Sequence, residues 1–334
     1  MDAAFIVKRK RKRMIKIICK KILQAIPVLI VVSVLSFMIV YFAPGDPVNM
    51  YIKPEMTKAQ IEKIRESLGL NAGIEEQYLH WVKNILQGNL GNSLVNHQSV
   101  AKQIVEKLPA TLKLMGVSLV LSLIVAIPIG MLSGYKENSR FDKSAMIFSY
   151  IGISIPKFWF AMMGIVVFTL KLKWLPNSGM RTVGIESVSD QIRHIIMPAI
   201  SLSLYNMAVF IRYVRSHTIR ELKQEYVYAA KAKGLTMRAV LKKHVLKNCL
   251  LPIITLVGMN MSELVTGSII IESVFGWPGM GTLGMTAITS RDYPMVMGVT
   301  MLSCLVLLIG NFLADALYCV IDPRIQKELK ASVG

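Results

Sequence analysis

The sequence lacks the common signatures of hydrolytic, ATP-hydrolysing and metal-dependent enzymes. It contains no G-x-x-x-x-G-K-[ST] phosphate loop, no G-x-S-x-G nucleophile turn and no H-E-x-x-H metal motif. The five histidines are scattered and show no spacing that suits a metal ion: His80, His97, His194, His217 and His244. We therefore expect no catalytic residue, no metal site and no cofactor on this chain.

Cysteine is also scarce, with four residues among 334: Cys19, Cys249, Cys304 and Cys319. No pair has C-x-x-C spacing, and each lies in or beside an apolar stretch. This arrangement excludes a disulfide framework and indicates small apolar side chains.

Acidic residues are few, with 20 Asp and Glu against 39 Lys and Arg. The excess of positive charge is concentrated in two places, with nine basic residues in 8–21 and ten in 212–247. The stretch 46–107 is balanced, with seven basic and seven acidic residues. Lys and Arg concentrate on the cytoplasmic side of membrane proteins, so the charge indicates membrane topology and not a nucleic-acid-binding surface.

Long uncharged runs are abundant, and hydrophobic residues make up 53% of the chain. Residues 22–45, 114–135, 194–211 and 293–314 carry no Asp, Glu, Lys or Arg. A bilayer core about 30 Å thick needs roughly 20 apolar residues per helix. We predict an all-α integral membrane protein with six transmembrane helices and both termini in the cytoplasm. The predicted spans are Ile22–Phe42, Thr111–Tyr135, Ser144–Leu170 with a kink at Pro156, Ile195–Ile211, Leu251–Phe275 and Met295–Val320.

These spans divide the chain into four parts. We expect a basic cytoplasmic N-terminus over 1–21 and a first transmembrane helix with an external helical region over 22–109. A five-helix part over 110–324 follows, and 325–334 form a cytoplasmic tail. The external region shows helical periodicity over Lys58–Leu68 and Gln77–Leu86.

The basic segment at about 222–248 has the pattern of two helices joined by a turn. Glu225–Lys233 favours a helix, Gly234 permits the left-handed turn that ends it, and Thr236 is a suitable N-cap for the next. Its apolar positions are Val227, Ala230, Leu235, Val240 and Leu241. Two interpretations fit this pattern equally well: a surface helix on lipid headgroups, or a docking site for another protein.

The stretch Gly279–Gly284 matches G-x-G-x-x-G, the dinucleotide-binding pattern. That pattern requires a preceding parallel strand, but here it follows the predicted Leu251–Phe275 membrane helix. We interpret it as a close-packed external turn or gate that involves Glu272, Pro278, Gly279 and Gly281.

Acidic residues within apolar spans are costly and often functional. Glu263 is the deepest, and we predict that it lines a hydrated translocation pathway with Asn260 and Ser262. The alternative is that Glu263 is protonated or held in an interhelical hydrogen bond. Asp315 lies near the predicted inner interface, and Glu272 adjoins the external turn and is expected to fix it.

Several of these motifs, in this order, resemble one known family. Pro44-Gly45-Asp46-Pro47 ends the first span, Ser154-Ile-Pro156-Lys-Phe158 lies in the third, and Asp322-Pro323-Arg324 follows the last. The segment Ala229-Ala230-Lys231-Ala232-Lys233-Gly234-Leu235 resembles the EAA loop, which docks on an ATPase subunit, although Tyr228 stands where that motif has glutamate. The chain is similar to the first, B-type permease subunit of dipeptide, oligopeptide and nickel ABC importers.

This resemblance implies a type I ABC importer fold and a division of labour among subunits. It favours the docking interpretation of the EAA-like segment and implies ATPase-coupling residues there: Tyr228, Ala229, Ala230, Lys231, Lys233, Gly234, Leu235 and Arg238. The implied partners are a second, C-type permease subunit, two P-loop ATPase subunits that hold ATP and Mg²⁺, and an extracytoplasmic substrate-binding protein.

The implied function is import of di- and oligopeptides across a prokaryotic cytoplasmic membrane, by alternating access that the partner ATPases drive. A nickel or metal-chelate importer is the alternative within the family. A secondary transporter is a more distant alternative, and paired inverted repeats are not evident in the sequence.

Overall fold

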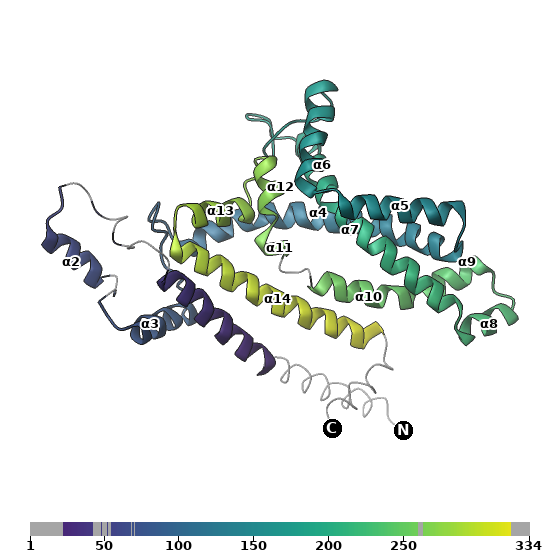
Figure 1. Ribbon diagram of the computed structural model, residues 1–334, viewed down its shortest axis with the longest axis horizontal. Coiled ribbons are helices and arrows are strands. Elements are labelled where there is room, and N and C mark those ends of the chain that lie inside the picture. Colours follow the sequence, from purple (N-terminus) through teal and green to yellow (C-terminus); the bar gives the residue numbers. More distant parts are fainter. Residues whose placement is uncertain are drawn as a thin grey trace. The chain divides into compact units, whose positions relative to one another are not determined.

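The computed structural model of the chain is built from helices (Figure 1). It describes residues 23–42, 48, 52, 55–67, 69, 71–259 and 263–321. Within these ranges, β-type pairing is limited to an isolated bridge between Asn92 and Ser99. The predicted all-α fold is confirmed. The predicted N-terminal region 1–21, the stretch 44–47, residues Asn260 and Ser262, and the chain beyond 321 lie outside the described residues.

The chain divides into two compact units. The first comprises residues 1–108 and 283–308. It holds the first helix, Leu23–Tyr41, then α2 (Lys58–Ser67), α3 (Ile74–Leu86), most of α13 (Met280–Thr289) and the first half of α14 (Tyr293–Ile321). The two helices expected in the external region are therefore present as α2 and α3.

Aromatic and polar contacts hold α3 against the first helix. The hydroxyl groups of Ser33 and Tyr78 lie 2.8 Å apart, and Ser33 is buried although it belongs to an apolar helix. Phe37 packs edge-on against Tyr78, with ring centroids 5.4 Å apart, and also lies next to Trp81. This face of α3 is thereby used for packing, whereas its other face remains exposed.

A buried aspartate organises the start of α14. Asp292 accepts hydrogen bonds from the Ser93 hydroxyl and from the backbone N–H of Leu94 at 3.1 Å. Close by in the same unit, a Cβ on Gly298 would lie 2.8 Å from Cγ1 of Val100, which is fully buried. The segment that leads into α4 is therefore packed directly on α14.

The second unit comprises residues 109–282 and 309–334. Its helices are α4 (Val100–Tyr135), α5 (Arg140–Ser154), α6 (Lys157–Gly164), the π-helix η2 (Ile165–Lys171), α7 (Val188–Leu222), α8 (Glu225–Ala232), α9 (Met237–Val240), the π-helix η3 (Leu241–Val245), α10 (Leu246–Met259), α11 (Glu263–Thr266) and α12 (Ile269–Val274). Helix α7 is its centre and packs against α5, α6, α10 and α12 (Figure 1).

Small residues let α4 approach α7 closely. Gly130 and Gly134 form a G-x-x-x-G pattern on α4, and a Cβ on either would lie within 3 Å of a side chain and a backbone carbonyl of α7. Membrane helices associate through such small-residue faces because lipid supplies no hydrophobic driving force between them. The adjoining apolar cluster includes Ala126, Phe210 and Ile211.

Among the described residues, four helices are long and apolar enough to cross a membrane: Leu23–Tyr41, Val100–Tyr135, Val188–Leu222 and Tyr293–Leu313. The pair Arg140–Ser154 and Lys157–Lys171 raises the number to five if it counts as one span, bent by 97°. The predicted kink at Pro156 is therefore a near right angle, which fits the bias of residues before proline against helical geometry.

The described residues do not confirm six spans. Within the predicted span Leu251–Phe275 the structure describes α10 up to Met259, and α11 and α12, which are separated at Gly267 and Ser268. Gly267, between α11 and α12, has a φ of +67°, which no right-handed helix accommodates. Apolar composition alone predicted one helix here, whereas the backbone turns at this glycine.

Candidate functional site

The EAA-like segment folds as a helical hairpin, Glu225–Val245, that comprises α8, α9 and η3. Helix α8 ends in a Schellman motif, because the Gly234 N–H donates to the Lys231 carbonyl at 2.9 Å and the Leu235 N–H donates to the Ala230 carbonyl at 3.2 Å. Gly234 has a φ of +81°, and a Cβ there would meet open space. Backbone conformation, and not crowding, therefore requires glycine at this turn.

Thr236 starts the second half of the hairpin, as the sequence predicted. Its side chain accepts a hydrogen bond from the Ala239 N–H at 3.4 Å. The sequence suggested a second short helix, but α9, η3 and α10 follow one another without a break from Met237 to Met259. The second half of the hairpin is therefore continuous with α10.

The inner side of the hairpin has its own apolar core. Val227, Val240 and Val245 are fully buried, and Leu235 and Leu241 pack against them. All five apolar positions predicted from the sequence contribute to this cluster: Val227, Ala230, Leu235, Val240 and Leu241.

A polar triad joins the hairpin to the helices on both sides. The Tyr226 hydroxyl and the Asn248 amide each donate a hydrogen bond of 2.7 Å to the same oxygen of Glu221. Burial, and then the hydrogen bond to this carboxylate, raise the pKa of Tyr226 above its usual value. The triad links α8 to the end of α7 and the start of α10.

The predicted coupling residues separate into two sets in the structure. Ala230 is buried and Leu235 half-buried, and both serve the core of the hairpin. The other six are exposed on its surface: Tyr228, Ala229, Lys231, Lys233, Gly234 and Arg238. Three of these six are basic and one is an aromatic residue, 62% exposed. The surface therefore offers an aromatic side chain and positive charge to an acidic partner.

The predicted outer turn surrounds a fully buried carboxylate, that of Glu272. One of its oxygens accepts a hydrogen bond from the Thr111 hydroxyl at 2.9 Å, and the other accepts from the Thr282 N–H at 3.1 Å. The Thr111 oxygen in turn accepts from the Met280 N–H at 2.7 Å. Trp277, also buried, donates from its indole nitrogen to the Ala110 carbonyl at 2.9 Å. The turn is thereby bonded to α4.

The glycines of this turn are required for space. A Cβ on Gly279 would lie 2.6 Å from a Glu272 oxygen, and one on Gly281 would lie 2.9 Å from the same oxygen. A Cβ on Gly267 would collide with the other oxygen. Pro278 is exposed. The G-x-G-x-x-G pattern begins after α12 and continues into α13, and no strand precedes it in the described residues, so it is not a dinucleotide-binding turn.

The predicted pathway residues are only partly visible. Glu263 is exposed at the start of α11, and its carbonyl accepts a hydrogen bond from the Gly267 N–H at 2.9 Å. Asn260 and Ser262 lie outside the described residues, so the grouping of the three remains a prediction.

One charged cluster of the second unit did not emerge from the sequence. Asp142, buried near the start of α5, forms a two-pronged ion pair with Arg215 of α7 and accepts further hydrogen bonds from Ser133 and from the Asn138 N–H. The Ser139-x-x-Asp142 capping pattern was a local signal for the helix start. Nothing local pointed to Arg215, which lies 73 positions away.

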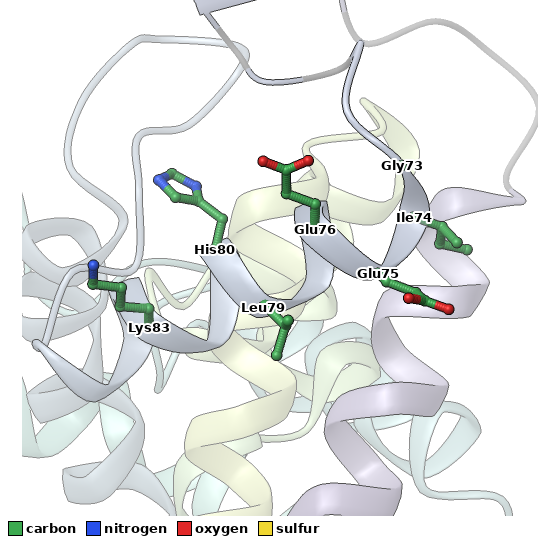
Figure 2. Close-up of a pocket in the computed structure, with 7 residues that line it drawn as sticks. All are labelled: Gly73, Ile74, Glu75, Glu76, Leu79, His80 and Lys83. Atoms are coloured by element: carbon green, nitrogen blue, oxygen red, sulfur yellow. The ribbon is translucent and has the colours of Figure 1, made fainter.

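The exposed side of α3 carries a shallow hollow in the first unit. Figure 2 shows Glu76, His80 and Lys83 following one another along α3, with Leu79 on another side of the helix. Leu79 and Leu86 are 65% and 82% exposed. The described residues contain no group of three His, Cys, Asp or Glu side chains placed to hold a metal ion, here or elsewhere.

Comparison with known proteins matches almost the whole chain. Residues 126–327 match the family "Binding-protein-dependent transport system inner membrane component", and residues 14–115 match its N-terminal companion family. The oligopeptide transport system permease protein AppB of Bacillus subtilis is 40% identical over 92% of this chain and 98% of that protein.

Two further similarities extend this picture. The glutathione transport system permease protein GsiC of Escherichia coli is 35% identical over 94% of this chain and 99% of that protein. The MetNI methionine ABC transporter, solved in inward-facing conformations, has a similar fold, with a TM-score of 0.53 and 17% identity over 66% of this chain and 96% of that chain.

Proposed function

The chain belongs to the family of binding-protein-dependent transport system inner membrane components, and from this premise we propose that it carries peptides across the membrane as one permease subunit of an ATP-driven importer. The peptide substrate is inferred from relatives that are named as oligopeptide, peptide and glutathione permeases. Nothing favours the nickel alternative, and membership of this family removes the support for a secondary transporter.

The observation that carries the coupling role is the hairpin Glu225–Val245 with six exposed predicted coupling residues. We infer that Tyr228, Lys231, Lys233 and Arg238 dock on a partner ATPase subunit, which binds ATP and Mg²⁺ in place of this chain. In this arrangement the hairpin lies in the cytoplasm, as the positive charge of 212–247 predicts. A rigid docking element is what alternating access requires, because a loose one would absorb the motion of the ATPase.

The remaining partners follow from the same proposal. A second permease subunit completes the translocation pathway, and an extracytoplasmic binding protein delivers the peptide. The exposed part of α3, where Glu76, Leu79 and Lys83 line a shallow hollow, is a suitable surface for the binding protein or the second permease. Glu263 then contributes an acidic side chain to the pathway, and the Glu272 turn supports its outer end.

The docking role can be tested at Gly234 with a matched control. Gly234→Val forces a β-branched residue into a left-handed conformation and should distort the Schellman turn. Gly184→Val imposes the same strain, because Gly184 has a φ of +82° and open space around it, but it lies in the loop before α7. Both variants should remain in the membrane.

The measurement is peptide uptake and ATP hydrolysis by the complex purified through a tag on this chain and reconstituted in liposomes. We expect the Gly234 variant to lose uptake per ATP hydrolysed, or to lose the ATPase subunits on purification, while the Gly184 variant retains both. Normal coupled uptake by the Gly234 variant would contradict the docking role. Absence of ATPase subunits from the purified wild-type complex would contradict the proposed function as a whole.

A further inference from the structure

Two cations in the second unit face tyrosine rings instead of carboxylates. The Lys157 ammonium nitrogen lies 4.8 Å from the ring centroid of Tyr205, and the guanidinium carbon of Arg212 lies 5.2 Å from that of Tyr150. Lys157 starts α6, Tyr150 belongs to α5, and the other two residues belong to α7. Tyr205 and Arg212 are seven positions apart, two helical turns, so they share one face of α7.

The predicted depth of Lys157 makes its charge unusual. Tyr205 is the central residue of α7, Val188–Leu222, and it lies within the predicted span Ile195–Ile211. The middle of a bilayer core is about 15 Å from either surface. On that prediction Lys157, next to Tyr205, lies near mid-membrane depth, whereas Arg212 lies about 10 Å farther along α7, at a rise of 1.5 Å per residue, and directly follows the end of the predicted span.

Neither cation has an anionic partner in the part of the chain that the structure describes. The buried Asp142 carboxylate of the same unit forms its ion pair with Arg215 instead. Lys157 and Arg212 form no ion pair or hydrogen bond with a described residue, and Tyr150 and Tyr205 are 56% and 39% exposed. A charge at the predicted depth of Lys157 is costly unless it faces a hydrated cavity or an oppositely charged ligand.

We propose that Lys157 and Arg212, each backed by a tyrosine ring, are two successive binding positions for the carboxylate of a peptide in transit. The inference rests on the proposed function and extends it to named residues for one end of the substrate. Glu263 could not serve this end, because its carboxylate would repel the peptide carboxylate.

The tyrosine rings explain how these positions bind the peptide carboxylate and still release it. A cation–π contact stabilises the cation through the ring quadrupole but leaves its charge unneutralised, so an arriving carboxylate still finds a full positive charge. An ion pair such as that of Asp142 and Arg215 would compete with the substrate. Transport requires sites that bind well enough to admit a ligand and weakly enough to release it to the next site.

The test compares one peptide with a free C-terminal carboxylate and the same peptide as its C-terminal amide. Uptake of each is measured in liposomes that hold the complete complex with its binding protein, and the free-to-amide ratio is compared between variants. This comparison cancels any preference of the binding protein. We expect Lys157→Met to lower the ratio about tenfold, the loss of roughly one charge-assisted hydrogen bond.

Conservative variants and a matched control sharpen the result. Lys157→Arg and Tyr205→Phe should keep the wild-type ratio, because charge and ring remain. Tyr205→Leu should lower the ratio about threefold, the size of an exposed cation–π contact. Arg212→Gln should lower it as Lys157→Met does. Lys171→Met removes an exposed lysine at the far end of the bent helix pair and should leave the ratio unchanged.

Two results would contradict this inference but leave the proposed function intact. One is an unchanged ratio in Lys157→Met and Arg212→Gln. The other is an equal fall in uptake of both peptides together with loss of the second permease subunit on purification, because the cations would then hold that subunit. Failure of the wild-type complex to import either peptide would instead refute the proposed function and this inference with it.

Discussion

The hairpin Glu225–Val245 and the Glu272 turn both depend on glycine, but for different physical reasons. At Gly234 the backbone adopts a left-handed conformation while open space surrounds the missing side chain. At Gly279 and Gly281 φ is not in that region, and the space that a side chain would need is filled by a buried carboxylate. Gly234 permits a left-handed backbone conformation, whereas Gly279 and Gly281 permit close contact with the Glu272 carboxylate.

This difference corresponds to two kinds of structure. The hairpin has an exposed surface and an apolar core of its own, so a side chain at Gly234 would meet no neighbour but would be forced into a strained left-handed conformation. The Glu272 turn has no spare volume, and its stability depends on one carboxylate that accepts hydrogen bonds from Thr111 and Thr282. The hairpin should therefore be most sensitive to changes in its backbone conformation, and the Glu272 turn to changes in the size and hydrogen bonding of its side chains.

The largest effect should follow from removal of the buried carboxylate. Glu272→Ala leaves the buried Thr111 hydroxyl without its acceptor and empties the space that the Glu272 side chain fills, and we expect a loss of about 3 kcal/mol in the free energy of unfolding. Thermal unfolding of the purified complex in detergent measures it. Ser273→Ala is the control, since Ser273 is the exposed next residue. Equal stability of the two variants would remove the basis of the comparison.

A smaller effect should distinguish two glycines of the same G-x-G-x-x-G stretch. Gly279→Ala places a Cβ 2.6 Å from the Glu272 carboxylate, and overpacking of this kind costs about 1–3 kcal/mol. Gly284→Ala should be neutral or slightly stabilising, because Gly284 lies within α13 and its nearest neighbour, Val299, would be 3.9 Å from the new Cβ. The same unfolding measurement applies. A destabilised Gly284 variant would show that space is limiting beyond the turn.

The smallest effect should come from the cap of the hairpin. Thr236→Ala removes the acceptor for the Ala239 N–H and should cost about 1 kcal/mol. Thr236→Ser keeps the hydroxyl and serves as the control. Amide hydrogen exchange should become faster in residues 237–241 only. Faster exchange at residues 269–282 as well would mean that the two regions do not behave independently.

Local features of both regions could be predicted from sequence. The turn at Gly234 and the cap at Thr236 depend on residues within three positions of each other, and the apolar positions of the hairpin follow helical periodicity. The exclusion of a dinucleotide site also depended on local context, because the glycine stretch follows a membrane helix and not a strand.

Contacts between distant residues could not be predicted in this way. Asp142 and Arg215 are 73 positions apart, and Thr111 and Glu272 are 161 apart, so no local pattern links them. The break at Gly267 escaped prediction because the flanking residues are apolar, and hydropathy reports composition but not φ. The division of the EAA-like residues into buried and exposed sets likewise required the packing of α8 on α9.

The length of α7 has a mechanical consequence for transport. Thirty-five residues at 1.5 Å each span about 52 Å, well beyond a hydrocarbon core of about 30 Å. The hairpin follows the far end of this rod, about 26 Å from the central residue Tyr205. A tilt of only about 10° around that centre would sweep the rod's end through ~4–5 Å while Tyr205 stays almost still. A modest swing at the hairpin end would therefore require little displacement at the midpoint, where Tyr205 faces Lys157.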